Sequence, residues 1–312
     1  MKIRAAVIQT ASVPFNKEAT VEKVLGLIKD GAETGAKLLV FPEALISGYP
    51  KGADFGARVG GRLPRGREEF LRYFDSAIDV PGPEVEQIAA AAAEAGVYVV
   101  IGVIEREIGT LYCTVLNFSP EGKMIGKHRK LMPTAMERLV WGYGDGSTMP
   151  VFDTPLGKLG SVICWEDFMP LMRMAMYSKG IQLYCTPTAD DREAWLTTVR
   201  HIAAEGRCFV LSACQYFTRA AFPDDYDAIQ GNEPDTVLLR GGSAIISPSG
   251  EILAGPDYNG ECILTAELDM DDISRGKYDF DVAGHYSRPD VFRLIVDETP
   301  KPPVVTMVDT FR

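Results

Sequence analysis

The sequence predicts an α/β fold built from two similar halves. Strand-like apolar runs alternate with amphipathic helical stretches from the first residues onward, a pattern that is typical of α/β proteins. The second half of the chain repeats the order of the first, and no Pro- or Ser-rich linker separates them. We therefore expect both halves to pack together in one domain, residues 1–296, followed by a tail, residues 297–312, at a surface or a subunit contact.

The first predicted elements are a strand, a helix and a second strand. Residues 3–9 are mostly apolar and lead directly out of the N-terminus, as a buried strand would. In residues 18–34 the apolar side chains recur every three or four positions, which predicts an amphipathic helix. Residues 37–41 form a short apolar run between polar neighbours, and we interpret this run as a second buried strand.

The first half continues with a helix, a strand and a hairpin. An Ala-rich stretch follows a Pro-Gly-Pro sequence, and Ala is the strongest helix former. A Ser-Pro-Glu-Gly sequence separates two further strand-like runs and is typical of a tight turn. The predicted elements are a helix at 85–95, a strand at 97–104, and hairpin strands at 111–118 and 124–128.

The second half repeats this order with uneven spacing. Residues 158–163 resemble the first strand, and residues 181–186 correspond to the strand before Pro42. A second Ser-Pro turn sequence at 247–250 matches the turn of the first half. The remaining predicted elements are helices at 169–179 and 192–206 and a strand at 208–212.

Two segments fit no repeat. Residues 48–67 are rich in Gly and Arg, and residues 216–239 are rich in Asp and Pro. Long irregular insertions of this kind are typical of binding loops, lids or subunit contacts.

Composition excludes several classes of partner. The formal net charge of −11 argues against nucleic acid, which needs a concentrated basic surface. Arg4 interrupts the first apolar run, so we expect no signal peptide, and no stretch reaches the ~20 apolar residues that span a membrane. We therefore expect a cytoplasmic protein without a membrane partner.

The cysteines and histidines predict neither disulfides nor a metal site. The six cysteines are scattered through mostly apolar segments, which favours reduced thiols. No Cys-x-x-Cys pair occurs, and the three histidines lie far apart. We expect no metal and no cofactor.

Three segments each place a reactive group at or near the end of an apolar run. Cys164 follows residues 159–163, Glu43 follows a Phe-Pro pair, and Lys130 closely follows a hairpin strand. A desolvated carboxylate can take a proton from a thiol, and a buried ammonium can lower the thiol pKa and stabilise developing negative charge. Together they would supply a base, an electrostatic stabiliser and a nucleophile. Taken singly, they have simpler interpretations as a cap, a surface charge and a packed small side chain.

The sequence around these residues carries a specific pattern. Val40-Phe41-Pro42-Glu43-Ala44 and the stretches 127–138 and 164–171 resemble the three signature segments of the nitrilase branch of the carbon–nitrogen hydrolase superfamily. Four further stretches resemble the plant-type nitrilases and their bacterial relatives: 141–147, 185–190, 241–250 and 280–289. The resemblance extends from Ile3 to about Val296.

This resemblance implies a fold and a catalytic set. The fold is an α-β-β-α sandwich with an internal pseudo-two-fold repeat, and the triad is Glu43, Lys130 and Cys164. Glu137 matches a further glutamate that orients the lysine in relatives. Relatives also form homo-oligomers, dimers that extend into spirals. One departure is Asp167, where plant-type relatives usually have Asn, and it adds a potential charge beside the nucleophile loop.

The implied activity is hydrolysis of a small nitrile, arylaliphatic or of the β-cyanoalanine type, to the carboxylic acid and ammonia. The reaction would pass through a cysteine thioimidate and a thioester, with some amide as a second product. The expected substrate-binding residues are Trp165, Tyr49, Trp141, Thr188 and Ala189, although each could instead pack in the core.

Three alternatives remain open at this stage. An amidase or carbamoyl hydrolase would use the same triad on an amide. A non-catalytic filament-forming or ligand-binding protein could keep the fold, although the intact triad argues against it. A Cys/His enzyme such as a protease has no support, because no histidine has a partner motif; His128 could tune Lys130 or simply make a hydrogen bond at the strand end.

Overall fold

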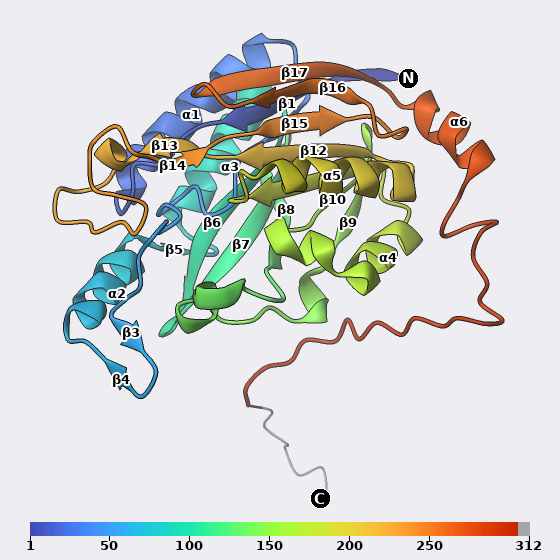
Figure 1. The fold of residues 1–312 in the computed structure, drawn as a ribbon. Helices are drawn as coiled ribbons and strands as arrows, with labels where there is room; N and C mark the ends of the chain where they lie inside the picture. Colours follow the sequence, from blue (N-terminus) through green and yellow to red (C-terminus); the bar gives the residue numbers. More distant parts are fainter. Residues whose placement is uncertain (305–312) are drawn as a thin grey trace, which may run out of the picture.

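Two β-sheets pack face to face in the computed structural model, which describes residues 1–304 (Figure 1). Apolar side chains from both sheets, among them Val7, Val100 and Leu211, form the core between them. The first sheet runs β17 (Cys262–Asp269), β1 (Lys2–Gln9), β2 (Leu38–Val40), β6 (Tyr98–Glu107), β7 (Thr110–Ser119) and β8 (Lys123–Arg129), with β5 (Ile78–Asp79) beside β6. The second runs β16 (Ile252–Asp257), β15 (Ser243–Ile246), β12 (Phe209–Cys214), β11 (Leu183–Thr188), β10 (Gly157–Ser161) and β9 (Val151–Thr154).

Helices cover the outer face of each sheet. α1 (Lys17–Glu33) and α3 (Pro83–Ala95) bury their apolar faces on the first sheet. α4 (Pro170–Ser178) and α5 (Glu193–Gly206) do the same on the second sheet. The layers therefore follow the order α-β-β-α, which confirms the predicted sandwich.

The two sheets share one strand order, and this confirms the internal repeat. Counted from β17 in the first sheet and from β9 in the second, each sheet has an antiparallel edge strand, then three parallel strands, then two further strands that pair antiparallel. β1, β2 and β6 are the parallel strands of the first sheet, and β10, β11 and β12 are those of the second. The carboxyl ends of parallel strands meet at one edge of a sheet, which is where α/β proteins place their functional groups.

Local sequence explains the ends of the covering helices. The Asn16 side chain caps α1 by accepting a hydrogen bond from the amide of Ala19. α3 begins at Pro83, whose fixed φ suits the first helical turn, and ends at Gly96, which adopts a left-handed φ of 63°. The strands and helices predicted above are confirmed with shifts of a few residues at their ends.

Several elements lack a counterpart in the prediction. Besides the short strands of the two insertions, they are β5, β9, β15, β16, β17, α2 (Arg65–Ser76) and α6 (Asp271–Asp279). β17 pairs with β1 along its whole length, from Lys2 opposite Asp269 to Gln9 opposite Cys262.

The two insertions fold against each other at one end of the sandwich. The first holds the short hairpin β3 (Ala57–Arg58) and β4 (Gly61–Arg62) and leads into α2, while the second holds β13 (Tyr216–Thr218) and β14 (Val237–Arg240). Arg72 of α2 pairs with Asp225 of the second insertion, and the Tyr226 hydroxyl donates to the Lys51 carbonyl at 2.9 Å. The insertions therefore form one unit (Figure 1).

The C-terminal segment runs along the surface. Residues 281–304 form no helix or strand, and the Lys301 amide donates to Asp145 at 2.7 Å. Of the predicted tail, residues 305–312 lie outside the described part of the chain. Within residues 1–304, no helix has both the length and the apolar character needed to cross a membrane.

Candidate active site

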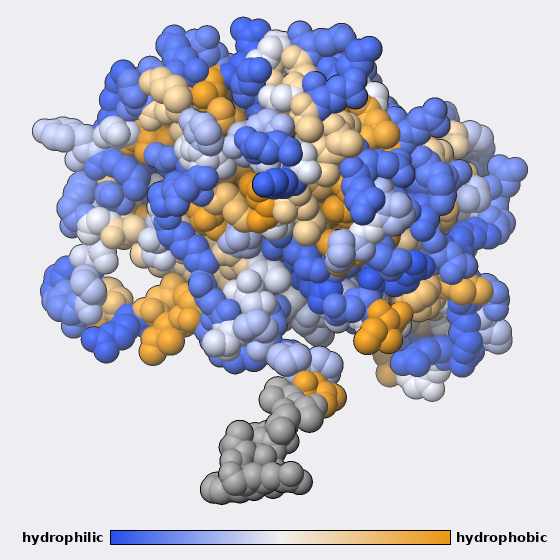
Figure 2. Space-filling view, turned by 180° about the vertical axis from the view of Figure 1, so that it is seen from behind, coloured by the Kyte–Doolittle hydropathy of each residue, from blue (hydrophilic) through white to orange (hydrophobic). Residues whose placement is uncertain are grey.

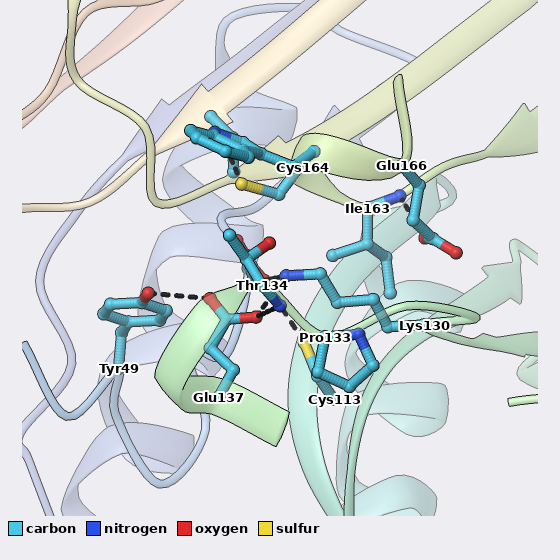
Figure 3. A network of polar contacts seen from close by, with 12 residues as sticks. Tyr49, Cys113, Lys130, Pro133, Thr134, Glu137, Ile163, Cys164 and Glu166 are labelled. Atoms are coloured by element: carbon cyan, nitrogen blue, oxygen red, sulfur yellow. Dashed lines mark hydrogen bonds and ion pairs between the residues drawn. The ribbon is translucent and has the colours of Figure 1, made fainter. Parts of the chain in front are cut away.

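The three candidate catalytic residues each follow the carboxyl end of a strand, two strands in the first sheet and one in the second. Glu43 lies just after β2, Lys130 directly after β8, and Cys164 opens the 3₁₀ helix η3 (Cys164–Phe168) after β10. β8 runs in the same direction as β6, because two antiparallel pairings separate them. The fold therefore brings together residues that are more than 120 positions apart in sequence. Figure 3 labels two of the three, Lys130 and Cys164.

Lys130 lies between two carboxylates. Its Nζ is 2.6 Å from Oε1 of Glu43 and 2.8 Å from Oε2 of Glu137. Burial alone would lower the lysine pKa, but the negative charges of Glu43 and Glu137 outweigh this effect and raise it well above its ordinary value. The side chain is therefore a fixed ammonium in a site with little water.

Glu43 has the character of a base. Burial raises the pKa of its carboxyl group, and the charge of Lys130 limits the rise. Oε1 faces Lys130 and the sulfur of Cys113 at 3.4 Å, whereas Oε2 is buried and meets no hydrogen-bond donor among the described residues. One carboxylate oxygen is thus held in place while the other is able to accept a proton.

Cys164 is a neutral thiol at rest. Burial and the nearby Glu43 carboxylate raise its pKa well above the ordinary value, more than the Lys130 charge lowers it. We expected the ammonium to lower this pKa; the surrounding carboxylates and the burial of the thiol reverse the balance. The thiolate must therefore form as its proton is taken, which requires a base.

The backbone at Cys164 is strained. Its φ of 55° lies in the left-handed region, which is unfavourable for a residue with a Cβ. The Thr188 hydroxyl, at the end of β11, donates to the Cys164 sulfur at 3.1 Å. Thr188, predicted to bind substrate, therefore contacts the Cys164 sulfur itself.

Two further residues hold the second carboxylate. The Tyr49 hydroxyl donates to Oε1 of Glu137 at 2.7 Å, and the Thr134 amide donates to Oε2 at 2.6 Å (Figure 3). Trp141 is nearly fully buried, and its ring centroid lies 5.5 Å from Lys130 Nζ and 5.9 Å from the ring of Tyr49. Tyr49 therefore orients Glu137, and Trp141 packs against the lysine.

Cys164 lines a cavity of about 150 Å³. Trp165 forms one side of it and is held in place, since its Nε1 donates to Asp190 at 2.8 Å and the Arg192 guanidinium lies over its ring at 4.9 Å. A second cavity of about 500 Å³ adjoins the first beneath the insertions and is lined in part by Trp141. The small cavity is lined by Cys164, Trp165, Ala189, Tyr49, Lys51, Thr134, Glu137, Asp190, Asp191 and Arg192.

Asp167 lies in a buried polar environment formed by Tyr184 and Thr186. Its carboxyl group is buried, accepts a hydrogen bond from the Tyr184 hydroxyl at 2.7 Å, and contacts the Thr186 hydroxyl. Burial raises its pKa to about 7, so the group is substantially protonated near neutral pH. The expected charge of Asp167 is therefore only partly present at neutral pH, because burial favours the protonated carboxyl group.

Sequence reasoning missed two neighbours of the triad, Cys113 and Glu166, and left the role of a third, His128, open. Cys113 lies in the apolar strand β7, where a thiol resembles any small core residue, yet it contacts Glu43. Glu166 and His128 form a buried pair beside Lys130 and Cys164. Both residues lie within the signature segments of the sequence, but the sequence does not show that they contact each other. Among residues 1–304, no three His, Cys, Asp or Glu side chains are grouped to hold a metal ion.

Comparison with known proteins agrees with this geometry. The family model described as carbon–nitrogen hydrolase matches residues 4–278. An aliphatic nitrilase of Sinorhizobium fredii (strain HH103) is 62% identical over 305 residues, covering 98% of this chain and 99% of the relative. Nitrilase 2 of Arabidopsis thaliana is 54% identical over 307 residues, covering 97% and 91%. A bifunctional nitrilase/nitrile hydratase of Lupinus angustifolius is 53% identical over 307 residues, covering 97% and 88%.

Solved structures agree on the fold. The crystal structure of Saccharomyces cerevisiae Nit3, described as a member of branch 10 of the nitrilase superfamily, superposes with a TM-score of 0.71 at 23% identity. The match covers 91% of this chain and 96% of that one. By its family model and its curated relatives, the chain belongs to the nitrilase branch of the carbon–nitrogen hydrolase family, close to plant nitrilases and their bacterial relatives.

Proposed function

We propose that this enzyme hydrolyses organic nitriles to carboxylic acids and ammonia, with Cys164 as nucleophile, Glu43 as base, and Lys130 as electrostatic stabiliser oriented by Glu137. The observation that carries the proposal is the buried ammonium of Lys130, bonded to two carboxylates beside the thiol. The nitrilase names of relatives at 53–62% identity support nitrile as the substrate.

The first step forms a covalent bond. The Cys164 sulfur attacks the nitrile carbon while Glu43 takes the thiol proton through Oε2, its free oxygen. The proton then passes to the nitrile nitrogen, which gives a neutral thioimidate. Lys130 stabilises the negative charge that develops on nitrogen, with the backbone N–H of Trp165 as a second donor. A raised pKa at Glu43 suits this role, because the carboxyl group must both accept the proton and return it.

Two waters complete the reaction. Glu43 activates the first water, which adds to the thioimidate carbon and gives a tetrahedral species bearing nitrogen, oxygen and sulfur. Protonation of the nitrogen releases ammonia and leaves a thioester. A second water then releases the carboxylic acid and restores the thiol. If the tetrahedral species expels sulfur instead, the product is an amide, in line with the nitrile hydratase activity named for the Lupinus relative.

Substitution of the nucleophile tests the proposal. We expect Cys164→Ser to lose ammonia release from nitriles by at least ~10⁴-fold, since an unactivated hydroxyl is a far weaker nucleophile than a thiol. Cys262→Ser is the matched control, because Cys262 is a free thiol on β17 outside the cavity. Turnover retained in folded Cys164→Ser would contradict the assignment.

The substrate class is open to a direct comparison. We propose arylaliphatic nitriles and β-cyanoalanine, because the small cavity at Cys164 shares lining residues with a larger cavity of a size that suits a ring. Lys51 lines both cavities and could face a substrate carboxylate. A parallel assay of both nitriles and their amides, with ammonia, acid and amide quantified, separates a nitrilase from an amidase or carbamoyl hydrolase. Turnover of the amides alone would favour the second.

We also propose a cytoplasmic homo-oligomer. All six cysteines are free, which suits a reducing compartment. The C-terminal segment presents Tyr286, Phe292 and Ile295 to solvent, with 61%, 77% and 83% of their surfaces exposed. The end of the described chain projects from the body of the molecule and carries apolar surface (Figure 2). Exposed apolar side chains of this density favour burial against another subunit.

A further inference from the structure

A buried ion pair lies behind the catalytic residues. His128 is on β8, Glu166 is in η3, and Nε2 of the histidine lies 3.0 Å from Oε2 of the glutamate. Both side chains are 0% exposed. Taking two charged groups out of water is costly, so a pair of this kind needs a full set of hydrogen bonds to persist.

The hydrogen bonds of His128 define its charge. Nδ1 faces the carbonyl oxygen of Thr148, and Nε2 faces the Glu166 carboxylate. A neutral imidazole has one N–H and can satisfy only one of these acceptors, whereas the imidazolium satisfies both. Burial lowers the pKa of His128, but the charge and hydrogen bond of Glu166 outweigh this effect and raise it overall. The pair is therefore an imidazolium bound to a carboxylate.

Glu166 also connects the two catalytic segments. Oε1 accepts from the amide of Leu131 at 2.6 Å, and Oε2 accepts from the amide of Ile163 at 3.0 Å. Leu131 follows Lys130, and Ile163 precedes Cys164. One carboxylate thus ties the stabilising cation of the first sheet to the nucleophile of the second, as Figure 3 shows for Ile163 and Glu166.

The nucleophile needs such support. The left-handed φ of Cys164 is unfavourable for a residue with a Cβ and persists only where neighbouring contacts hold it. Glu166 bonds to the residue just before this strained position. Resting on the function proposed above, we propose that Glu166 and His128 are positioning residues that set the placement of the Cys164 sulfur relative to the Lys130 ammonium.

Two glutamine variants and one control test this inference. Glu166→Gln and His128→Gln each break the ion pair. Glu105→Gln is the matched control, since Glu105 is also a buried carboxylate, bonded to Thr114, Lys127 and Arg129, but has no bond to the triad. Two rates are measured in each folded variant: nitrile turnover, and alkylation of Cys164 by iodoacetamide located by peptide mass mapping.

We expect Glu166→Gln to lower kcat about 100-fold with KM changed less than ~3-fold, because a misplacement near 1 Å has this effect. Alkylation of Cys164 should slow about tenfold. His128→Gln should act in the same direction, and the double variant should be no slower than Glu166→Gln, because groups that act as a unit are not additive. Glu105→Gln should stay within ~3-fold of the unsubstituted enzyme in both rates.

Two results would overturn the inference. One is a folded Glu166→Gln enzyme with unchanged kcat and unchanged alkylation of Cys164. The other is an equal loss in Glu105→Gln, which would indicate general destabilisation. If Glu166→Gln does not fold, His128→Gln, which keeps the carboxylate, decides between the same outcomes. If the unsubstituted enzyme turns over no nitrile, the proposed function fails, while the alkylation rates still test the positioning pair.

Discussion

At the scale of single residues, surroundings decide what each of the six thiols can do. Burial raises the pKa of the Cys185 thiol. Burial is also the main reason why the pKa of Cys208 is raised to about 12. Neither thiol lies within hydrogen-bond distance of a carboxylate oxygen in the described chain. Cys164 combines burial with a base, a hydroxyl donor and a strained backbone. The strand-end positions of Glu43, Lys130 and Cys164 were readable from the sequence. Contacts that cross from one sheet to another were not, because no local pattern encodes them.

Removal of the Tyr49 hydroxyl should weaken the proposed role of Lys130 in catalysis. The hydroxyl donates to Glu137, which in turn holds Lys130. We expect Tyr49→Phe to lower kcat about tenfold, the effect of one hydrogen bond to a charged group. Tyr98→Phe is the control, since Tyr98 is buried on β6 away from this network. Steady-state kinetics in which both variants match the unsubstituted enzyme would remove Tyr49 from the orienting set.

Asp167 should make stability depend on pH. Its pKa is raised from 3.8 to about 7 in the folded state, so the folded protein holds this proton more tightly than the unfolded chain. Its contribution is most favourable below about pH 4 and is lost progressively up to about pH 7, where ionisation penalises the fold by a few kcal/mol. Asp167→Asn cannot ionise and should therefore raise the melting temperature at pH 8 and leave it nearly unchanged at pH 4.

Thermal melts across pH check this expectation. Asp235→Asn serves as a control because Asp235 is exposed in the second insertion. An Asp167→Asn enzyme whose melting temperature follows pH as the unsubstituted enzyme does would show that Asp167 is not the titrating group.

At the scale of elements, close backbone approach fixes the base. Gly102 of β6 exchanges hydrogen bonds with the segment around Glu43: its amide donates to Pro42 at 3.1 Å, and its carbonyl accepts from Leu45 at 2.9 Å. A Cβ on Gly102 would lie 2.4 Å from the Pro42 carbonyl oxygen and 2.6 Å from Glu43 Cα. Both are backbone atoms, so they can move only with the whole segment.

Gly102→Ala should therefore displace Glu43 from Lys130 and lower kcat by at least about tenfold, in keeping with the sensitivity of catalysis to small displacements. Gly26→Ala in α1 is the control, because nothing lies within 4 Å of its added Cβ and alanine favours a helix. Kinetics and melting curves of the two variants, compared side by side, check the expectation. Full activity in Gly102→Ala would mean that the Glu43 segment tolerates the shift.

Most of the elements that were not predicted have one feature in common: their own sequences show a weak apolar pattern. β17 buries only Ala266 and Leu268 and depends for its structure on β1, far away in sequence. α2 carries many charges and buries only Gly66, Tyr73 and Ser76, so its apolar periodicity is weak. Strongly apolar central strands such as β6 and β11 are fully or nearly fully buried and were predicted from composition alone. Sequence patterns report burial well and distant pairing poorly.

At the scale of the whole molecule, the repeat divides the chemistry between its halves. The first half supplies Glu43, Lys130 and Glu137, and the second supplies Cys164 and Thr188. The internal repeat was readable from the sequence because both halves keep the same order of elements. The packing of the two insertions and the path of the C-terminal segment could not be predicted, because they depend on long-range contacts such as that of Arg72 with Asp225.

The proposed oligomer should depend on the apolar C-terminal segment. We expect Phe292→Ser combined with Ile295→Ser to shift the protein toward smaller species in light scattering coupled to gel filtration, because these side chains lose apolar area to bury. Ile108→Ser is the control, since Ile108 is 98% exposed at the β6–β7 turn. An unsubstituted enzyme that elutes as a monomer at micromolar concentration would contradict the oligomer.

The pairing of β1 with β17 has a consequence for how the protein is made. The ladder joins residues 2–9 to residues 262–269, so the first sheet stays open at β1 until nearly the whole chain has left the ribosome. A chain that ends before Cys262, either because it is still being synthesised or because it was terminated early, exposes the hydrogen-bonding edge of the apolar strand β1. Exposed edges of this kind recruit other strands. Molecular chaperones that shield strand edges should therefore matter most for this enzyme during translation.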